Sequence, residues 1–128
     1  GGQYSNFTYR PFTLEGNFAF AQGVHEMLLQ SHKNYIEIFP AIPSSWKNVS
    51  FNDLRAQGAF LISAKKENGS IDKVQIVSEE GGSLRLKLPF KTFYIQNASK
   101  KYSFDKEENI LEIKMKEREK IVVKNGYE

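Results

Sequence analysis

The feature that most restricts the fold is a series of short β-prone runs, separated by turn signals, from about residue 35 onward. The clearest run, residues 84–88 (LRLKL), alternates strictly between apolar and charged residues. A strand with one buried face and one solvated face shows this pattern. Asn68-Gly69, between the runs at 60–64 and 73–77, is a strong signal for a hairpin turn. About seven or eight such strands predict an antiparallel β-sandwich.

The only helical pattern precedes these runs. Across residues 18–31 apolar side chains recur at helical spacing and leave a narrow polar edge. Asn17 is a suitable N-cap for this helix. A helix that is apolar over so much of its circumference needs burial on several sides, which one short sandwich does not easily provide. We therefore expect a helix followed by a sandwich, with the helix packed against a further domain.

Composition excludes several classes of protein. The 128 residues are 40% hydrophobic and include no cysteine, so we expect a globular core without disulfides or a thiolate metal site. The formal charge is +3, but acidic residues are interleaved with the lysines, so we expect solvated strand faces and no nucleic-acid partner. A run of about 18 apolar residues is absent, so we expect no membrane insertion. No signal peptide is seen, which leaves localisation open.

Few residues suggest chemistry of their own. The two histidines, His25 and His32, lie seven positions apart, and two ligands without a carboxylate at motif spacing do not predict a zinc site. No serine has the pattern of a nucleophile elbow. We therefore expect neither a metal nor a cofactor.

Five aromatic residues are candidates for stacking on a sugar ring: Trp46, Tyr94 and Tyr102, together with Phe51 and Tyr127. Core packing or a domain contact is the interpretation that we favour for them. Trp46 lies in a proline-rich loop close to the expected helix, where it could wedge between two domains.

Several segments carry a resemblance to a known family. Residues 10–18 (RPFTLEGNF) lead into 26–32 (EMLLQSH), and 38–46 (IFPAIPSSW) and 54–60 (LRAQGAF) come next. Together they resemble the end of the catalytic domain, and the segment after it, in glycoside hydrolase family 95, the α-L-fucosidase family. The resemblance covers about residues 9 to 64.

The resemblance implies an architecture and a chemistry. Residues 1–33 would be the last loop and helix of an (α/α)6 barrel, and residues 34–128 an appended β-sandwich, so the fold would be mainly β with one helix left over from the barrel. Family members cleave α-L-fucosides or related galactosides with inversion, using Asn side chains, supported by an Asp, to hold the water. The residue matching that Asp is Glu15, one methylene longer, with Asn17 as its loop neighbour.

These observations leave three hypotheses. The first is a non-catalytic terminal domain of a larger bacterial enzyme. Its partner would be the catalytic domain of the same enzyme, through which it would meet glycan substrates, and the parent enzyme would be secreted or periplasmic. The second is a carbohydrate-binding module with exposed aromatics. The third is a small independent hydrolase using Glu15 with Glu26 or Glu79. We also expect that an apolar helix without its partner could drive homodimerisation.

Overall fold

The structure is a computed structural model that describes residues 6–9, 12–14, 27–40, 42, 44–96 and 100–127, with backbone alone at 6–9 and 12–14. Twelve strands occur in this part of the chain. They are β1 (Asn6–Tyr9), β2 (Phe12–Leu14), β3 (Leu29–Ser31), β4 (Ile36–Ile38), β5 (Val49–Ala56), β6 (Phe60–Glu67), β7 (Ser70–Ser78), β8 (Gly82–Lys87), β9 (Phe93–Ile95), β10 (Tyr102–Asp105), β11 (Ile110–Met115) and β12 (Lys120–Asn125).

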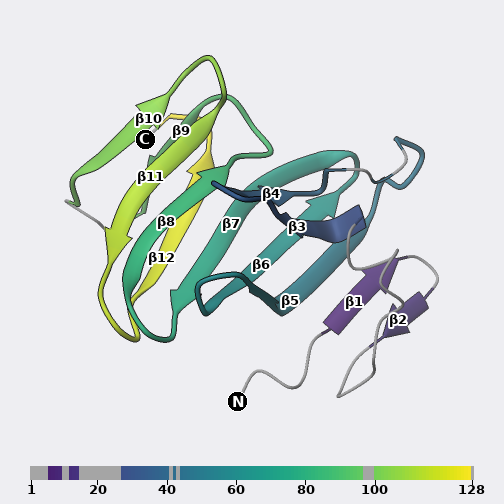
Figure 1. Cartoon of the computed structure of the whole chain (residues 1–128). Coiled ribbons are helices and arrows are strands. Elements are labelled where there is room, and N and C mark those ends of the chain that lie inside the picture. Colours follow the sequence, from purple (N-terminus) through teal and green to yellow (C-terminus); the bar gives the residue numbers. More distant parts are fainter. Residues whose placement is uncertain are drawn as a thin grey trace.

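The strands form two sheets that are stacked as layers (Figure 1). A seven-stranded sheet has the order β2-β1-β5-β6-β7-β12-β9, and a five-stranded sheet has the order β10-β11-β8-β4-β3. Neighbouring strands are antiparallel, except that β4 and β8 are parallel. The expected sandwich is thus confirmed as a mainly β, two-layered arrangement.

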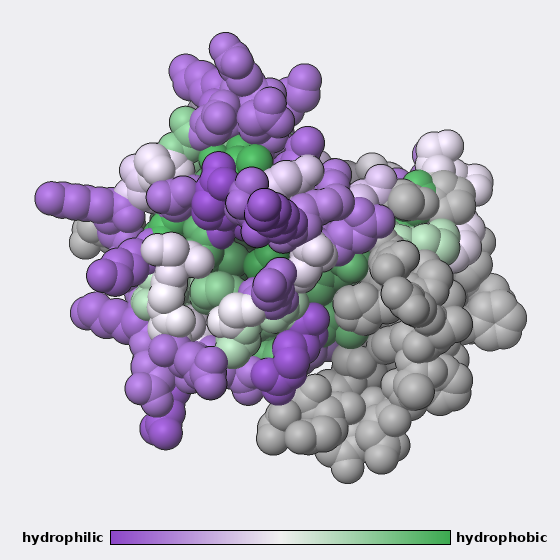
Figure 2. All heavy atoms as spheres, in the orientation of Figure 1, coloured by the Kyte–Doolittle hydropathy of each residue, from purple (hydrophilic) through white to green (hydrophobic). Residues whose placement is uncertain are grey.

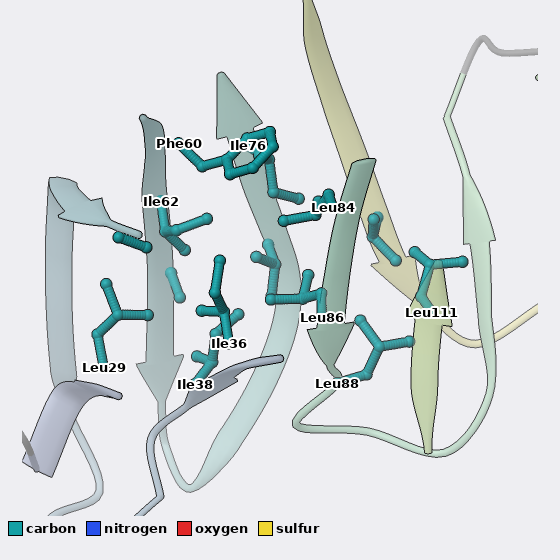
Figure 3. Close-up of a cluster of buried hydrophobic side chains, with 14 of the residues drawn as sticks. Leu29, Ile36, Ile38, Phe60, Ile62, Ile76, Leu84, Leu86, Leu88 and Leu111 are labelled. Atoms are coloured by element: carbon teal, nitrogen blue, oxygen red, sulfur yellow. The ribbon is translucent and has the colours of Figure 1, made fainter. Parts of the chain in front are cut away.

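Alternation along the strands places the core between the layers. In the predicted run at 84–88, the three leucines are buried and Arg85 and Lys87 are only partly covered. Strands of both sheets contribute to the same cluster, and Figure 3 shows these side chains meeting between the layers. The labelled members are Leu29, Ile36, Ile38, Phe60, Ile62, Ile76, Leu84, Leu86, Leu88 and Leu111.

The hairpin predicted at Asn68-Gly69 is confirmed. Both residues have positive φ, 51° and 80° respectively, as the tight turns that suit the twist of paired strands require. The turn is also tied to the loop before β5, since Asn68 N–H donates to Asn48 Oδ1 at 3.1 Å and Gly69 N–H donates to the Lys47 carbonyl at 2.9 Å.

The C-terminal end of the expected helix is a strand in the structure. Residues 15–26 lie outside the described part of the chain, and among the described residues only Met27 and Leu28 have helical backbone. The prediction is wrong for Leu29–Ser31, which form β3 and pair with β4. Leu28 and Leu29 are both fully buried, and the Leu28 carbonyl accepts a hydrogen bond from Phe39 N–H at 2.8 Å. Burial against the sheets and strand pairing outweigh the helical spacing of these apolar residues.

Candidate functional site

A pocket of about 330 Å³ opens where two turns meet one end of β8. The turn between β3 and β4 supplies its first wall, and the turn between β5 and β6 supplies the second. Its lining residues are His32, Lys33, Asn34, Tyr35, Ile36, Gln57, Gly58, Phe60, Ser83 and Arg85. The pocket is therefore built from segments that lie far apart in the sequence.

The β5–β6 turn is fixed in place by contacts with both sheets. Gln57 N–H donates to Ser31 Oγ at 3.0 Å, which links the turn to the end of β3. Glu79 N–H donates to the Ala59 carbonyl at 3.0 Å. Gly58 has φ +90°, and a Cβ there would lie 2.8 Å from a ring carbon of the buried Phe60. This position therefore requires glycine both for its backbone conformation and for close packing.

The rim of the pocket carries an aromatic and charged group from the β3–β4 hairpin. His32 Nε2 lies 3.1 Å from Glu37 Oε1, and the His32 and Tyr35 rings have centroids 4.6 Å apart. The Lys87 ammonium lies 5.8 Å from the Tyr35 ring centroid, within the range of a cation–π contact. Because Lys87 lies on β8, the neighbouring strand of β4 in the five-stranded sheet, its contact with Tyr35 ties the hairpin to that strand.

Arg85 joins the rim to the next strand. Its Nη1 donates to the Asn34 carbonyl at 3.1 Å, and its Nε lies 3.0 Å from Glu112 Oε2 on β11. In the view of Figure 2, hydrophilic side chains project over this side of the molecule, and hydrophobic surface is visible between them near the centre. No local pattern signals these contacts, because Asn34 and Arg85 are 51 positions apart.

A third ion pair lies beyond the turn, where Arg55 Nη1 and Nη2 both approach the Glu79 carboxylate. Glu37 and Glu79 are thus each engaged by a basic side chain, which suits a polar contact surface. Among the described residues no group of three or more His, Cys, Asp or Glu is arranged to hold a metal ion. The same part of the chain contains no helix long and apolar enough to span a membrane.

The aromatic candidates come from different segments of the fold, and the candidate stacking role is wrong for Phe51, which is fully buried in the core. Tyr102, on β10, is 50% exposed and its ring centroid lies 5.5 Å from that of Phe93. Tyr94 is half-buried on β9, at one edge of the seven-stranded sheet. Trp46 is half-buried against the core just before β5, with β6, β7 and β12 between β5 and β9.

The remaining sequence candidates lie outside the described residues: Glu15, Asn17, His25 and Glu26. Their roles stay predictions.

Comparison with known proteins bears on this geometry. The family model described as "Glycoside hydrolase family 95, C-terminal domain" matches residues 30–123, a range that includes the whole described pocket. A protein named "Alpha-L-fucosidase 2" from Arabidopsis thaliana is 40% identical over 89 residues, which are 67% of this chain and 11% of that protein. The chain therefore spans a small part of the relative that it matches.

Proposed function

Because the chain belongs to the family of C-terminal domains of glycoside hydrolase family 95, we propose that it is the non-catalytic terminal sandwich of a larger enzyme. That enzyme removes terminal α-L-fucosyl, or related galactosyl, groups with inversion. The observation that carries the proposal is the family match over residues 30–123, which coincides with a continuous sandwich core. The relative's name, together with the 11% of its length that is matched, supports a parent whose catalytic groups lie mostly elsewhere.

Glu15 is the residue of this chain that we propose to serve the parent's active site. Inversion requires one carboxylic acid to protonate the leaving oxygen and one base to activate water on the opposite face. By resemblance, Glu15 supports the side chains that hold this water. It is a positioning residue in this proposal, because it acts through other groups.

The pocket between the two turns is the surface that we propose to contact the parent's catalytic domain. Its walls come from residues 32–36 and 57–60, which overlap the segments that resemble the family. Its ion pairs are partly exposed, and contacts between domains of one chain are more polar than a core. The division of the chain near residue 33 remains part of this proposal.

The test compares the isolated chain, the parent and variants of the parent on an aryl α-L-fucoside. We expect no activity from the isolated chain. Parent Glu15→Ala should lose about a hundredfold or more in kcat with little change in KM, since misplacing a catalytic water is expensive. Glu15→Asp, which restores the family's usual residue, should recover most of the loss. The matched control, Glu108→Gln, removes an equal charge at an exposed turn of the sandwich and should leave kcat within about twofold.

Two outcomes would contradict the proposal. Full activity of parent Glu15→Ala would make Glu15 a structural residue. Turnover by the isolated chain would favour an independent hydrolase. The carbohydrate-module alternative would rest on Trp46, Tyr94 and Tyr102, of which Trp46 is packed against the core and Tyr102 is 50% exposed.

A further inference from the structure

Lysines from three strands line up on the outer face of the seven-stranded sheet. Lys73 on β7 lies directly opposite Lys124 on β12, and Lys124 lies opposite Tyr94 on β9. On the other side of β7, Lys65 on β6 lies opposite Ser50 on β5. The pairing of β6 with β7 shifts its register at Lys65, between Ala64 and Lys66. Each of these residues has at least one neighbour within its strand that is buried in the core, namely Phe51, Ala64, Val74, Val123 and Ile95. We call this line of side chains, Ser50, Lys65, Lys73, Lys124 and Tyr94, the basic row.

The charges of the basic row are poorly compensated within the chain. Like charges directly opposite each other in a sheet are unfavourable, and Lys73 and Lys124 are such a pair. Lys65 pairs with Glu67 at 2.8 Å, but both side chains are about 60% exposed or more, so the pair is weak. In the described part of the chain, neither Lys73, Lys124 nor the adjacent Asp72 takes part in an ion pair. Contacts among the described residues thus leave the charges of Lys73 and Lys124 uncompensated.

A hollow lies along the β5 to β7 part of the row. It has a volume of about 430 Å³ and is lined by Ser50, Asn52, Ser63, Ala64, Lys65, Lys73 and Gln75. Hydroxyl and amide groups of this kind both donate and accept hydrogen bonds, as the hydroxyls of a sugar do. The hollow is partly open to solvent, so a glycan chain has access to its lining residues.

We propose that the basic row binds an acidic polysaccharide, one that carries carboxylates or sulfate esters. The lysines would neutralise its charges, the amides and hydroxyls would bind its hydroxyls, and Tyr94 would stack on a sugar face. The row crosses four strand spacings, about 19 Å, which is long enough for several sugar units. Single-stranded nucleic acid fits less well, because it is bound by several aromatic groups on which successive bases stack, and the row has one. This inference rests on the proposed function in one respect: the parent acts on glycans.

The experiment measures binding of the 128-residue chain by calorimetry to four probes. Two are acidic glycans, polygalacturonate and dextran sulfate, which separate carboxylate from sulfate as the source of charge. Dextran is the neutral glycan, and a single-stranded oligonucleotide is the polyanion without sugar rings to stack. We expect at least one acidic glycan to bind about tenfold or more tighter than dextran and the oligonucleotide, with an affinity that falls as salt rises.

The paired variants are Lys73→Gln/Lys124→Gln, in the row, and Lys106→Gln/Lys114→Gln, which lie at the β10–β11 turn and on β11. The first should weaken acidic-glycan binding by about tenfold or more, and the second, with the same change in charge, by less than about twofold. Circular dichroism shows that each variant is folded. Equal binding of dextran, equal binding of the oligonucleotide, no binding of any probe, or an unaffected row variant would each overturn the proposal.

Activity on a small aryl fucoside separates this inference from the proposed function. The row variant in the parent should keep that activity, because the small substrate does not reach the basic row. A parent without fucosidase activity would contradict the proposed function. The glycan titrations would still test the basic row, because they do not depend on that activity.

Discussion

At the scale of single residues, Glu119 shows how one carboxylate organises a turn. Its Oε1 accepts a hydrogen bond from Lys116 N–H at 2.8 Å and lies 2.9 Å from Lys100 Nζ. The backbone hydrogen bond is the main cause that lowers the pKa of Glu119 below its usual 4.5. Partial burial opposes this effect, and the Lys100 ammonium reinforces it. Both contacts favour the ionised form.

The stability of the chain should therefore depend on pH through Glu119. Because its pKa is lower in the folded chain, its contribution is fully present above the unfolded pKa near 4.5 and is lost as pH falls through the folded pKa. Glu119→Gln should cost on the order of 1 kcal/mol at about pH 7, and the gap to the unsubstituted chain should narrow toward about pH 3. Urea unfolding at several pH values measures this. Glu108→Gln, at an exposed turn position, is the control, and a gap for Glu119→Gln that stays constant with pH would contradict the prediction.

The burial of single side chains could be predicted only where apolar and polar residues alternate regularly. The alternation at 84–88 correctly separated the buried leucines from Arg85 and Lys87. By contrast, nothing near His32 in the sequence indicates that its ring faces Tyr35 and Glu37. That contact arises because a short hairpin folds β4 back along β3, and a turn of that kind carries no glycine or proline signal here.

At the scale of elements, the strands with clean alternation were predictable and β5 was not. Within β5, Phe51 and Leu54 are both buried although they are three positions apart, and the pairing with β6 shifts between them. Asp53, within this bulge, has φ 54°. A bulge inserts an extra residue and breaks the period of two on which strand prediction relies. The prediction for β3 was wrong for a different reason, because Leu29 continues the helical spacing of the apolar residues that precede it.

The geometry of the β5–β6 turn predicts that Gly58 is needed for stability, and a matched pair of glycine substitutions tests this. Gly58→Ala combines positive φ with a contact of 2.8 Å to the Phe60 ring, and should lower the free energy of unfolding by about 2–3 kcal/mol. Gly126→Ala also has positive φ, 106°, but nothing within 4 Å of the added carbon, so only about 1 kcal/mol should be lost. Chemical denaturation measures both. Equal losses would mean that Phe60 moves aside freely and that the turn is not held by packing.

At the scale of the whole molecule, the number and spacing of the strands predicted two layers, but they did not predict the order of the strands within each sheet. β12 pairs with β7 and β9, and β4 runs parallel to β8, about 50 positions later in the chain. Such pairings depend on contacts between distant segments, which no local period encodes. The candidate site could not be predicted from local sequence either. Short segments were enough to show the resemblance to a family, whereas the pocket forms only because two turns that are distant in the sequence meet.

The boundary of the sandwich is the remaining question at this scale, and it is open to a direct test. The family model begins at residue 30, whereas the resemblance suggested a division near residue 33. Leu28 and Leu29 are fully buried in the core, and β3 covers the β4 edge of the five-stranded sheet. A shortened chain of residues 27–128 should therefore keep a cooperative unfolding transition, although loss of β1 and β2 bares the edge of β5 and should promote self-association.

A chain of residues 34–128 should fare worse, because it loses both leucines and β3. We expect its free energy of unfolding to be lower than that of 27–128 by about 3 kcal/mol or more, the cost of emptying one or two large apolar sites. Urea unfolding compares the two chains, and sedimentation separates self-association from loss of folding. Equal stability would place β3 with the preceding domain and support a division near residue 33. A large difference would make Leu28 and Leu29 part of the sandwich itself.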